Sequence, residues 1–279
     1  MSVPKFLELP PGVTPSVREG LHGDIAMLSA EAVGESRGHI LLIPGWTGSK
    51  EDFTPLLPLL AASGYDATTY DQAGQYESEP GDDYSLEGYA RDALWLARCD
   101  GGTRTHLMGH SFGGLVAQQA AVLDPSRVLS LSLLCTGPGA LGDSDRRPLK
   151  KLVSAIGKVP LLQLHEIRES GIKRPAQITR FLAKRFTSND PRSLRAMTQL
   201  LIDAPDIIDD VLATGVPTWV GRGADDDAWP HDVQASMASR LGTEIHVVPD
   251  SAHSPAVENP DGLLEAWLPF LETHHMEIG

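Results

Sequence analysis

Short apolar runs of strand length alternate with longer helical patterns through most of this chain of 279 residues. The runs are HILLIP (39–44), DATTY (66–70), THLMG (105–109), RVLSLSLLC (127–135), VPTWVGRG (216–223) and TEIHVVP (243–249). Strands that alternate with helices are typical of a mostly parallel sheet whose two faces are both covered. We therefore predict an α/β domain whose chemistry gathers in the loops at the carboxyl ends of the strands.

The stretch between residues 137 and 214 breaks this alternation, because it carries helical patterns with no strand between them. The patterns are RPLKKLVSAIGKV, PAQITRFLAKRF and PRSLRAMTQLLIDAPDIIDDVLA. We predict a core domain of residues 1–136 and 215–279 and a helical insertion of residues 137–214. The insertion either adds packing helices at the edge of the sheet or forms a cap that shapes a substrate pocket, and we favour the cap.

Composition and charge argue against several functional classes. Hydrophobic residues make up 41% of the chain, yet no apolar run approaches the roughly 20 residues that a membrane span requires. A formal net charge of −14 repels phosphate backbones, so we expect no nucleic-acid partner. The two cysteines, Cys99 and Cys135, fit neither a disulfide framework nor a zinc site. No secretory signal is visible, and we expect a cytoplasmic protein.

The segment Gly109-His110-Ser111-Phe112-Gly113 matches the G-x-S-x-G pattern and lies between a predicted strand and a predicted helix. This spacing is typical of a sharp strand-to-helix turn that exposes the serine hydroxyl at its apex. Side chains two residues before and after the serine would collide, which explains the glycines. The following helix points its backbone N–H groups toward the turn. Ser111 is our candidate nucleophile, and the alternative is a serine that only caps the helix.

A serine hydroxyl is a weak nucleophile, so it requires a basic partner, and the base requires an acid that orients it. The histidines downstream of the candidate serine are His165, His231, His246, His253, His274 and His275. We select His253, because it directly follows the predicted strand at 243–249 in a turn-rich loop. His231 is a weaker alternative, and His165 lies in the insertion. We expect His110 to be structural or to shape the pocket.

Three adjacent carboxylates, Asp225, Asp226 and Asp227, follow the predicted strand at 216–223 and are candidates for the orienting acid. Adjacent side chains point in different directions, so at most one of the three can orient the histidine. The other two are then loop caps or solvated charges. The residues by themselves leave the choice among the three open.

Together these features resemble the α/β-hydrolase superfamily, and in particular a serine esterase-like or lipase-like member with a cap. PGWTGS (44–49) resembles the family's H-G-x oxyanion loop, and DQAGQYES (71–78) resembles its D-x-R-G-x-G-x-S segment. GADDDAWP (223–230) resembles the acid loop G-x-x-D-x-x-x-P, whose register selects Asp226, and DSAHSPAVENP (250–260) resembles the histidine loop. The resemblance implies an α/β-hydrolase fold: a mostly parallel sheet of roughly eight strands flanked by helices, with a helical cap after strand 6.

The resemblance also implies an oxyanion hole made of the backbone N–H groups of Trp46 and Phe112. The side chains of Trp46, Phe112 and Trp229 are our candidates for substrate binding, with packing in the core as the alternative. The same alternatives apply to four apolar residues of the insertion, Leu152, Ile156, Leu161 and Leu164. Two positions depart from the family pattern, because Pro44 replaces the usual histidine and Ala73 the usual arginine. Both concern the support of the oxyanion loop.

We therefore predict a serine hydrolase that cleaves a carboxylic ester, a lactone or a thioester of a small, apolar substrate through an acyl-enzyme on Ser111. His253 is the predicted base and Asp226 the acid that orients it, with no metal and no organic cofactor. An acyltransferase or a carrier thioesterase with the same triad is the first alternative. A small-molecule receptor or a lyase on the same fold is the second. The sequence specifies no oligomeric state.

Overall fold

Eight strands form one sheet at the centre of the computed structural model, which describes residues 2–98 and 104–274. The strands are β1 Val13–Glu19, β2 Asp24–Ala30, β3 His39–Ile43, β4 Asp66–Tyr70, β5 Thr105–His110, β6 Val128–Leu134, β7 Thr218–Gly223 and β8 Ile245–Val248. Their spatial order is β1-β2-β4-β3-β5-β6-β7-β8. β2 is antiparallel to both of its neighbours, and every pairing from β4 across to β8 is parallel. The predicted mostly parallel sheet of roughly eight strands is confirmed. Cys99 and His275 lie outside the described residues.

Six of the eight strands were predicted from the sequence, and burial accounts for the missed edge strand β1 but not for β2, whose sequence DIAMLSA is mostly buried. Every residue of β3 and of β5 is buried; β3 is apolar from Ile40 to Ile43, whereas β5 carries only Leu107 and Met108 at its centre. β1 lies at the edge of the sheet, and most of its side chains are exposed. Its sequence, VTPSVRE, therefore carries no apolar run, and its proline is tolerated because an edge strand leaves some backbone groups without a ladder partner.

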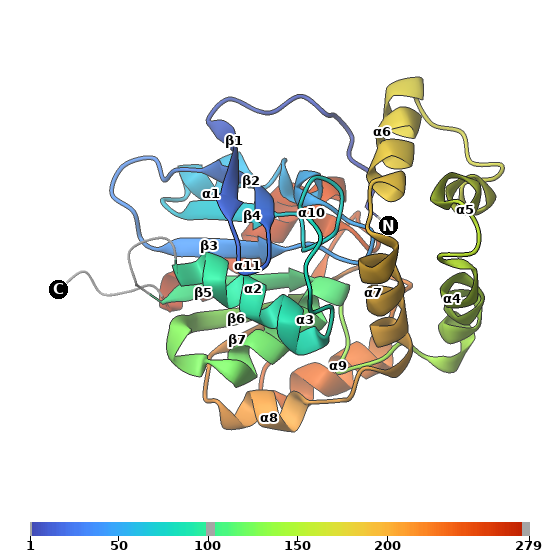
Figure 1. The fold of residues 1–279 in the computed structure, drawn as a ribbon. Helices are drawn as coiled ribbons and strands as arrows, with labels where there is room; N and C mark the ends of the chain where they lie inside the picture. Colours follow the sequence, from blue (N-terminus) through green and yellow to red (C-terminus); the bar gives the residue numbers. More distant parts are fainter. Residues whose placement is uncertain (1, 99–103, 275–279) are drawn as a thin grey trace.

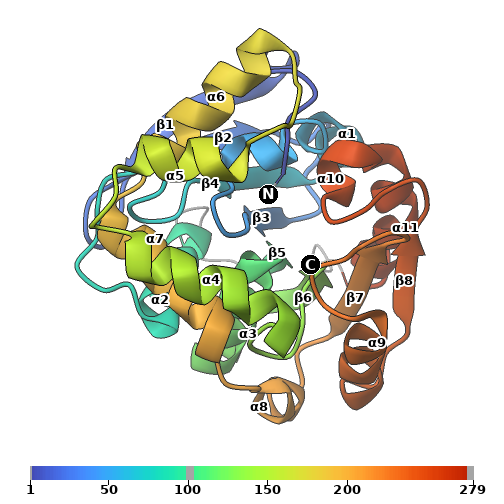
Figure 2. The same ribbon diagram turned by 90° about the vertical axis from the view of Figure 1, so that its right-hand side faces the viewer.

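Helices cover both faces of the sheet (Figures 1 and 2). One core cluster joins the sheet to α2, α3 and α9, and a second joins it to α1, α10 and α11. Alternate residues of β3 divide between them, because Leu41 and Ile43 belong to the first cluster and Ile40 and Leu42 to the second. The elements outside the insertion are η1 Lys50–Phe53, α1 Leu57–Ala62, α2 Leu86–Arg98, α3 Phe112–Leu123, η2 Pro125–Arg127, α9 His231–Arg240, α10 Pro255–Glu258 and α11 Pro260–Thr273.

The chain between β6 and β7 is helical, as predicted for the insertion after the sixth strand. Its helices are α4 Asp143–Ala155, α5 Leu161–Arg168, α6 Ala176–Thr187, α7 Pro191–Asp203 and α8 Ile208–Ala213. In Figure 1, α4 to α7 form a layer beyond the carboxyl ends of the parallel strands, whereas α8 packs against α3 and α9. Across the described residues, no helix combines the length and the apolar character that crossing a membrane requires.

Candidate active site

Ser111 occupies a strained turn between β5 and α3. Its backbone has φ 56° and ψ −121°, a conformation that costs a non-glycine residue about 1–3 kcal/mol. Both glycines of the motif are required by close backbone approaches: a Cβ on Gly109 would collide with the backbone of Gly113, and a Cβ on Gly113 would collide with the carbonyl oxygen of Ile43. The Ser111 N–H donates to the carbonyl of Leu134, which ties the turn to β6.

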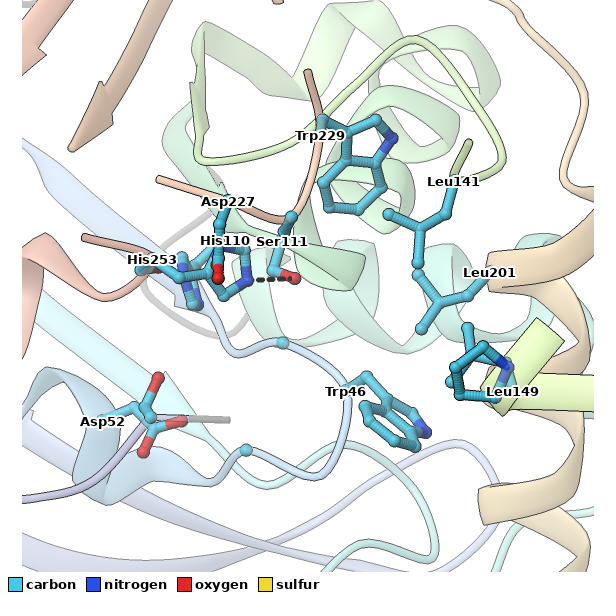
Figure 3. A pocket seen from close by; sticks show the side chains of 15 residues that line it. Trp46, Asp52, His110, Ser111, Leu141, Leu149, Leu201, Asp227, Trp229 and His253 are labelled. Carbon is cyan, nitrogen blue, oxygen red and sulfur yellow. Dashed lines mark hydrogen bonds between the residues drawn. The ribbon is translucent and has the colours of Figure 1, made fainter. Parts of the chain in front are cut away.

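Three predicted residues from separate loops are joined by hydrogen bonds. Ser111 Oγ lies 3.0 Å from His253 Nε2, and His253 Nδ1 lies 2.7 Å from Asp226 Oδ1 (Figure 3 shows the first of these contacts). An ionised carboxylate only accepts hydrogen bonds, so Nδ1 carries the ring proton and donates it to Asp226. Nε2 is then the acceptor of the serine hydroxyl. The sequence pattern singled out Ser111 and His253, and the resemblance to the family's acid loop selected Asp226.

Asp226 is the carboxylate of the three adjacent aspartates that reaches His253. It is almost fully buried, whereas Asp225 and Asp227 are exposed. Burial by itself would raise the pKa of Asp226, but the hydrogen bond and charge of His253, with donation from the Ala228 N–H, outweigh it and hold the pKa below its ordinary value. The carboxylate is therefore ionised at neutral pH and able to orient the imidazole.

His110, the residue before the serine, supports the histidine loop. Its side chain is buried, and Nε2 donates to the backbone carbonyl of His253 at 2.5 Å. Burial, together with the neighbouring His253 ring, lowers the pKa of His110 to about 3, so the ring is neutral at physiological pH. This geometry agrees with the expected structural role, although the sequence did not predict which segment His110 supports.

The other candidate histidines lie elsewhere. His165 is buried in α5, His246 lies in β8, and His274 follows the end of α11. His231 lies close to the acid but pairs its Nε2 with the backbone carbonyl of Asp226 at 2.7 Å. Within the described residues, His253 is the histidine whose ring hydrogen-bonds the serine hydroxyl.

The loop of residues 44–49 lies directly against the serine. A Cβ on Gly45 would lie 3.0 Å from Ser111 Cβ, so a side chain there would require Ser111 to shift by a few tenths of an ångström. Gln72 supports this loop, because its Nε2 donates a hydrogen bond to the carbonyl oxygen of Pro44 at 2.8 Å. Sequence reasoning missed Gln72; its only signal was its place beside Ala73 in the segment that departs from the family pattern.

Trp46 connects this loop to the insertion. Its indole Nε1 donates to Thr198 Oγ1 of α7 at 3.0 Å. Within the described part of the chain, the backbone N–H groups of Trp46 and Phe112 make no hydrogen bond. At Ala73, where the family usually has arginine, the backbone carbonyl accepts from Ser193 Oγ of α7 at 2.9 Å. A contact from the insertion thus supports this segment at the position where the family pattern has arginine.

A cavity of about 270 Å³ opens over the serine hydroxyl (Figure 3). In the close view, Leu141, Leu149 and Leu201 of the insertion stand on the side opposite His253. The lining residues are Ser2, Gly45, Trp46, Gly48, Asp52, His110, Ser111, Leu141, Pro148, Leu149, Leu201, Asp227, Ala228, Trp229 and His253. The wall away from the histidine is therefore mainly apolar.

The structure corrects one predicted substrate contact. The Phe112 side chain is fully buried in the core, edge-on to Tyr89 at 5.7 Å between ring centroids, and does not line the cavity. As the first residue of α3, it points toward α2 rather than over the sheet edge. Trp46 and Trp229 both line the cavity. Of the four apolar residues of the insertion, Leu152 and Leu164 line a second cavity, while Ile156 and Leu161 pack around Phe186.

A group of potential metal ligands overlaps the site. Donor atoms of His110, Cys135 and His253 lie within 4.8 Å of one another. Burial, and then the negative charge of Asp226, raise the pKa of the Cys135 thiol, so it stays protonated and is a poor ligand. Both imidazoles are already hydrogen-bonded, His110 to a carbonyl and His253 to its two partners. A metal here would have to displace these contacts.

A model of the alpha/beta hydrolase family matches residues 40–266, which is most of the chain. The chain belongs to the alpha/beta hydrolase family. The predicted family and fold class are thereby confirmed. The match includes the serine turn, the acid loop and the histidine loop of this family member.

Relatives of this family member are hydrolases. A protein of Variovorax paradoxus (strain S110), assigned as the carbamate hydrolase RutD, is 36% identical over 110 residues, or 38% of this chain and 41% of that protein. The pimeloyl-[acyl-carrier protein] methyl ester esterase of Neisseria meningitidis serogroup A is 25% identical over 252 residues, or 84% of this chain and 76% of the esterase. A thermophilic esterase of Thermogutta terrifontis has a TM-score of 0.75 at 21% identity, covering 94% of this chain and 100% of that one. At that identity the likeness shows the fold alone.

Proposed function

We propose that this protein is a serine hydrolase that cleaves a carboxylic ester, or a related lactone or thioester, through an acyl-enzyme. The observation that carries the proposal is the chain of contacts from Ser111 Oγ to His253 at 3.0 Å and from His253 to Asp226 at 2.7 Å. A hydrogen-bonded nucleophile, base and orienting acid are the arrangement that serine-based acyl transfer requires.

In the first half of the reaction, His253 Nε2 takes the proton of Ser111 as Oγ attacks the substrate carbonyl carbon. Asp226 keeps the imidazole in the tautomer that leaves Nε2 able to accept, and it stabilises the imidazolium that forms. The imidazolium then gives its proton to the departing alcohol, which leaves the acyl group on Ser111. Water activated by the same imidazole releases the acid and restores the serine.

The negative charge on the carbonyl oxygen needs donors that are already in place. The backbone N–H groups of Trp46 and Phe112 are our proposed oxyanion hole, because both are without an internal acceptor in the described chain and flank Ser111. Removing one donor of such a pair typically raises the barrier by about 3–4 kcal/mol. Since both donors are backbone groups, side-chain substitution at Trp46 should preserve the hole and alter the cavity.

We also propose that residues 137–214 act as a cap over the site. In support, Leu141, Leu149 and Leu201 of this segment line the cavity opposite His253. An apolar wall of this kind favours a small, apolar acyl group. The two relatives with named substrates, a carbamate hydrolase and a methyl ester esterase, also act on a carbonyl that carries a leaving heteroatom.

The test combines active-site labelling with ester hydrolysis. A fluorophosphonate should label Ser111 in wild type, identified by peptide mass spectrometry, and the label should be lost in His253→Ala. Asp226→Asn should lower kcat for a short ester by about 10³- to 10⁴-fold, a loss typical of an acid of this kind. Asp225→Asn is the matched control with the same charge change, because Asp225 is exposed and does not line the cavity, and we expect it to stay within a few-fold of wild type. Full activity in Ser111→Ala would overturn the proposal.

A further inference from the structure

A second cavity, of about 390 Å³, lies between α4 and α5 of the insertion. It is lined by Trp46, Pro148, Leu149, Lys151, Leu152, Ala155, Leu164, Ile167 and Arg168. Three of these residues, Trp46, Pro148 and Leu149, also line the cavity over the serine. The two cavities are therefore neighbours that share part of their lining, so the second is the nearby apolar space for the far part of a chain that begins at Ser111.

The charged groups of the second cavity are of one sign. Its two ionisable lining residues are Lys151 and Arg168, and no acid lines it. The nearest acid along the chain, Glu169, forms an ion pair with Arg174. The cavity thus combines apolar walls with two basic side chains and no acidic lining residue.

Within the described residues, the carboxylate whose charge acts on Arg168 is that of Glu169, which is itself paired with Arg174. The Arg168 guanidinium lies over the Trp46 ring at 4.6 Å and over the Phe186 ring at 5.1 Å. Its Nη1 is buried and donates no hydrogen bond, and within the described residues Arg168 forms no ion pair. Burial lowers its pKa to about 10, so the group remains charged at neutral pH. Keeping a buried donor unsatisfied costs free energy that an anion would recover.

We propose that the second cavity is a subsite for an acyl chain whose far end is a carboxylate. The apolar walls would contact the methylene groups, and Arg168 would bind the terminal carboxylate, for which the guanidinium fork is well matched. The substrate class is then a monoester of a dicarboxylic acid. This inference rests on the proposed function, because the ester end must reach Ser111.

The kinetic test compares monomethyl esters of linear dicarboxylic acids, from succinate to sebacate, with neutral methyl alkanoates of equal length. We expect wild type to favour the charged ester by about 10- to 100-fold in kcat/KM at its best length, mainly through KM, as for a hydrogen bond to a charged group. Arg168→Met should reduce this preference at least tenfold, and Arg168→Lys should retain part of it. The preference is the kcat/KM of the charged ester divided by that of the neutral ester. If Arg168→Met also disturbs Trp46, that disturbance changes both values equally and leaves the ratio unchanged.

Arg180→Met is the matched control, since Arg180 is an exposed arginine of α6 that does not line either cavity. It makes the same change in net charge and should keep the wild-type preference. Hydrolysis of neutral esters with no preference for the charged series, in wild type and Arg168→Met alike, would overturn the subsite and leave the proposed hydrolase standing.

A binding measurement tests the carboxylate subsite independently of the proposed hydrolase activity. Ser111→Ala should bind the best monomethyl ester more tightly than the neutral ester in isothermal titration calorimetry, and adding Arg168→Met should remove the difference. If wild type hydrolyses no ester but this difference is found, the subsite stands and the hydrolase proposal fails. Equal binding of the two esters by Ser111→Ala would overturn the subsite.

Discussion

Replacing Arg185 by methionine should destabilise the whole fold, because its charge is buried and paired. Arg185 projects from α6 and is fully buried. Its Nη1 donates to Asp52 Oδ1 at 2.7 Å, and its Nη2 donates to the carbonyl of Ser2 at 2.6 Å. Asp52 is also buried and follows the loop that carries Trp46. One side chain therefore joins the insertion, the first residues of the chain and the loop beside Ser111.

The expected loss follows from what the substitution leaves behind. Methionine fills most of the volume of the arginine stem, but the Asp52 carboxylate remains buried without its partner. Breaking a buried pair in this way costs about 3–5 kcal/mol, out of a total stability of about 5–15 kcal/mol for a domain. Asp52→Asn in addition to Arg185→Met removes the stranded charge, so the double variant should be clearly more stable than the sum of the single losses predicts.

Urea unfolding followed by circular dichroism measures these differences, with the midpoint compared at unchanged m-value. Arg180→Met on the same helix is the matched control and should stay within about 0.5 kcal/mol of wild type, as for most exposed substitutions. A loss below about 1 kcal/mol in Arg185→Met, or strict additivity of the two substitutions, would refute the argument that this buried pair holds the insertion to the core.

Three further substitutions test the support of the site. The folded-state pKa of His110 lies at about 3, below its ordinary 6.5, because of burial and a neighbouring histidine. Below pH 6.5 the unfolded chain therefore binds a proton at His110 that the folded chain does not, so the free energy of unfolding falls as the pH falls. In urea unfolding, His110→Gln should lose less stability than wild type between about pH 7 and about pH 4.5. An equal loss in the two proteins would contradict this pH dependence. Gly113→Ala drives a methyl group into the carbonyl of Ile43, so we expect loss of soluble protein or of fluorophosphonate labelling, and normal labelling would mean that the turn can relax. Gln72→Leu removes the hydrogen bond to the Pro44 carbonyl, so the loop of residues 44–49, which bears a proposed oxyanion donor, loses its support. We expect kcat to fall about tenfold with little change in KM. An unchanged kcat would show that this loop keeps its conformation without Gln72.

The elements that position the site were predictable because each has a strong local signal. β3 is buried on both faces, so its apolar run stands out against the polar segments around it. The strand-to-helix turn at Ser111 requires glycine at two positions for reasons of backbone contact alone. β1 carries no such signal, because an exposed edge strand has no need of apolar residues.

The side chains that support the site were less predictable. Phe112 is beside the candidate nucleophile in sequence, yet its ring packs on Tyr89 in the core rather than lining the cavity. Gln72 and Arg185 make contacts with residues distant in the chain, at Pro44 and Asp52. No periodicity or residue spacing in the sequence predicts either contact.

The sequence by itself determined the order of six of the eight strands, the position of the serine turn and the loops that bear the acid and the histidine, because hydrophobic periodicity and backbone sterics act over a few residues. The tertiary structure alone decided which side chains meet. The 3.0 Å contact of Ser111 with His253, the exposure of Asp225 and Asp227, and the stacking of Arg168 on Trp46 all depend on how segments far apart in the chain pack together. Packing between distant segments fixes the direction of each side chain, and local sequence patterns do not encode it.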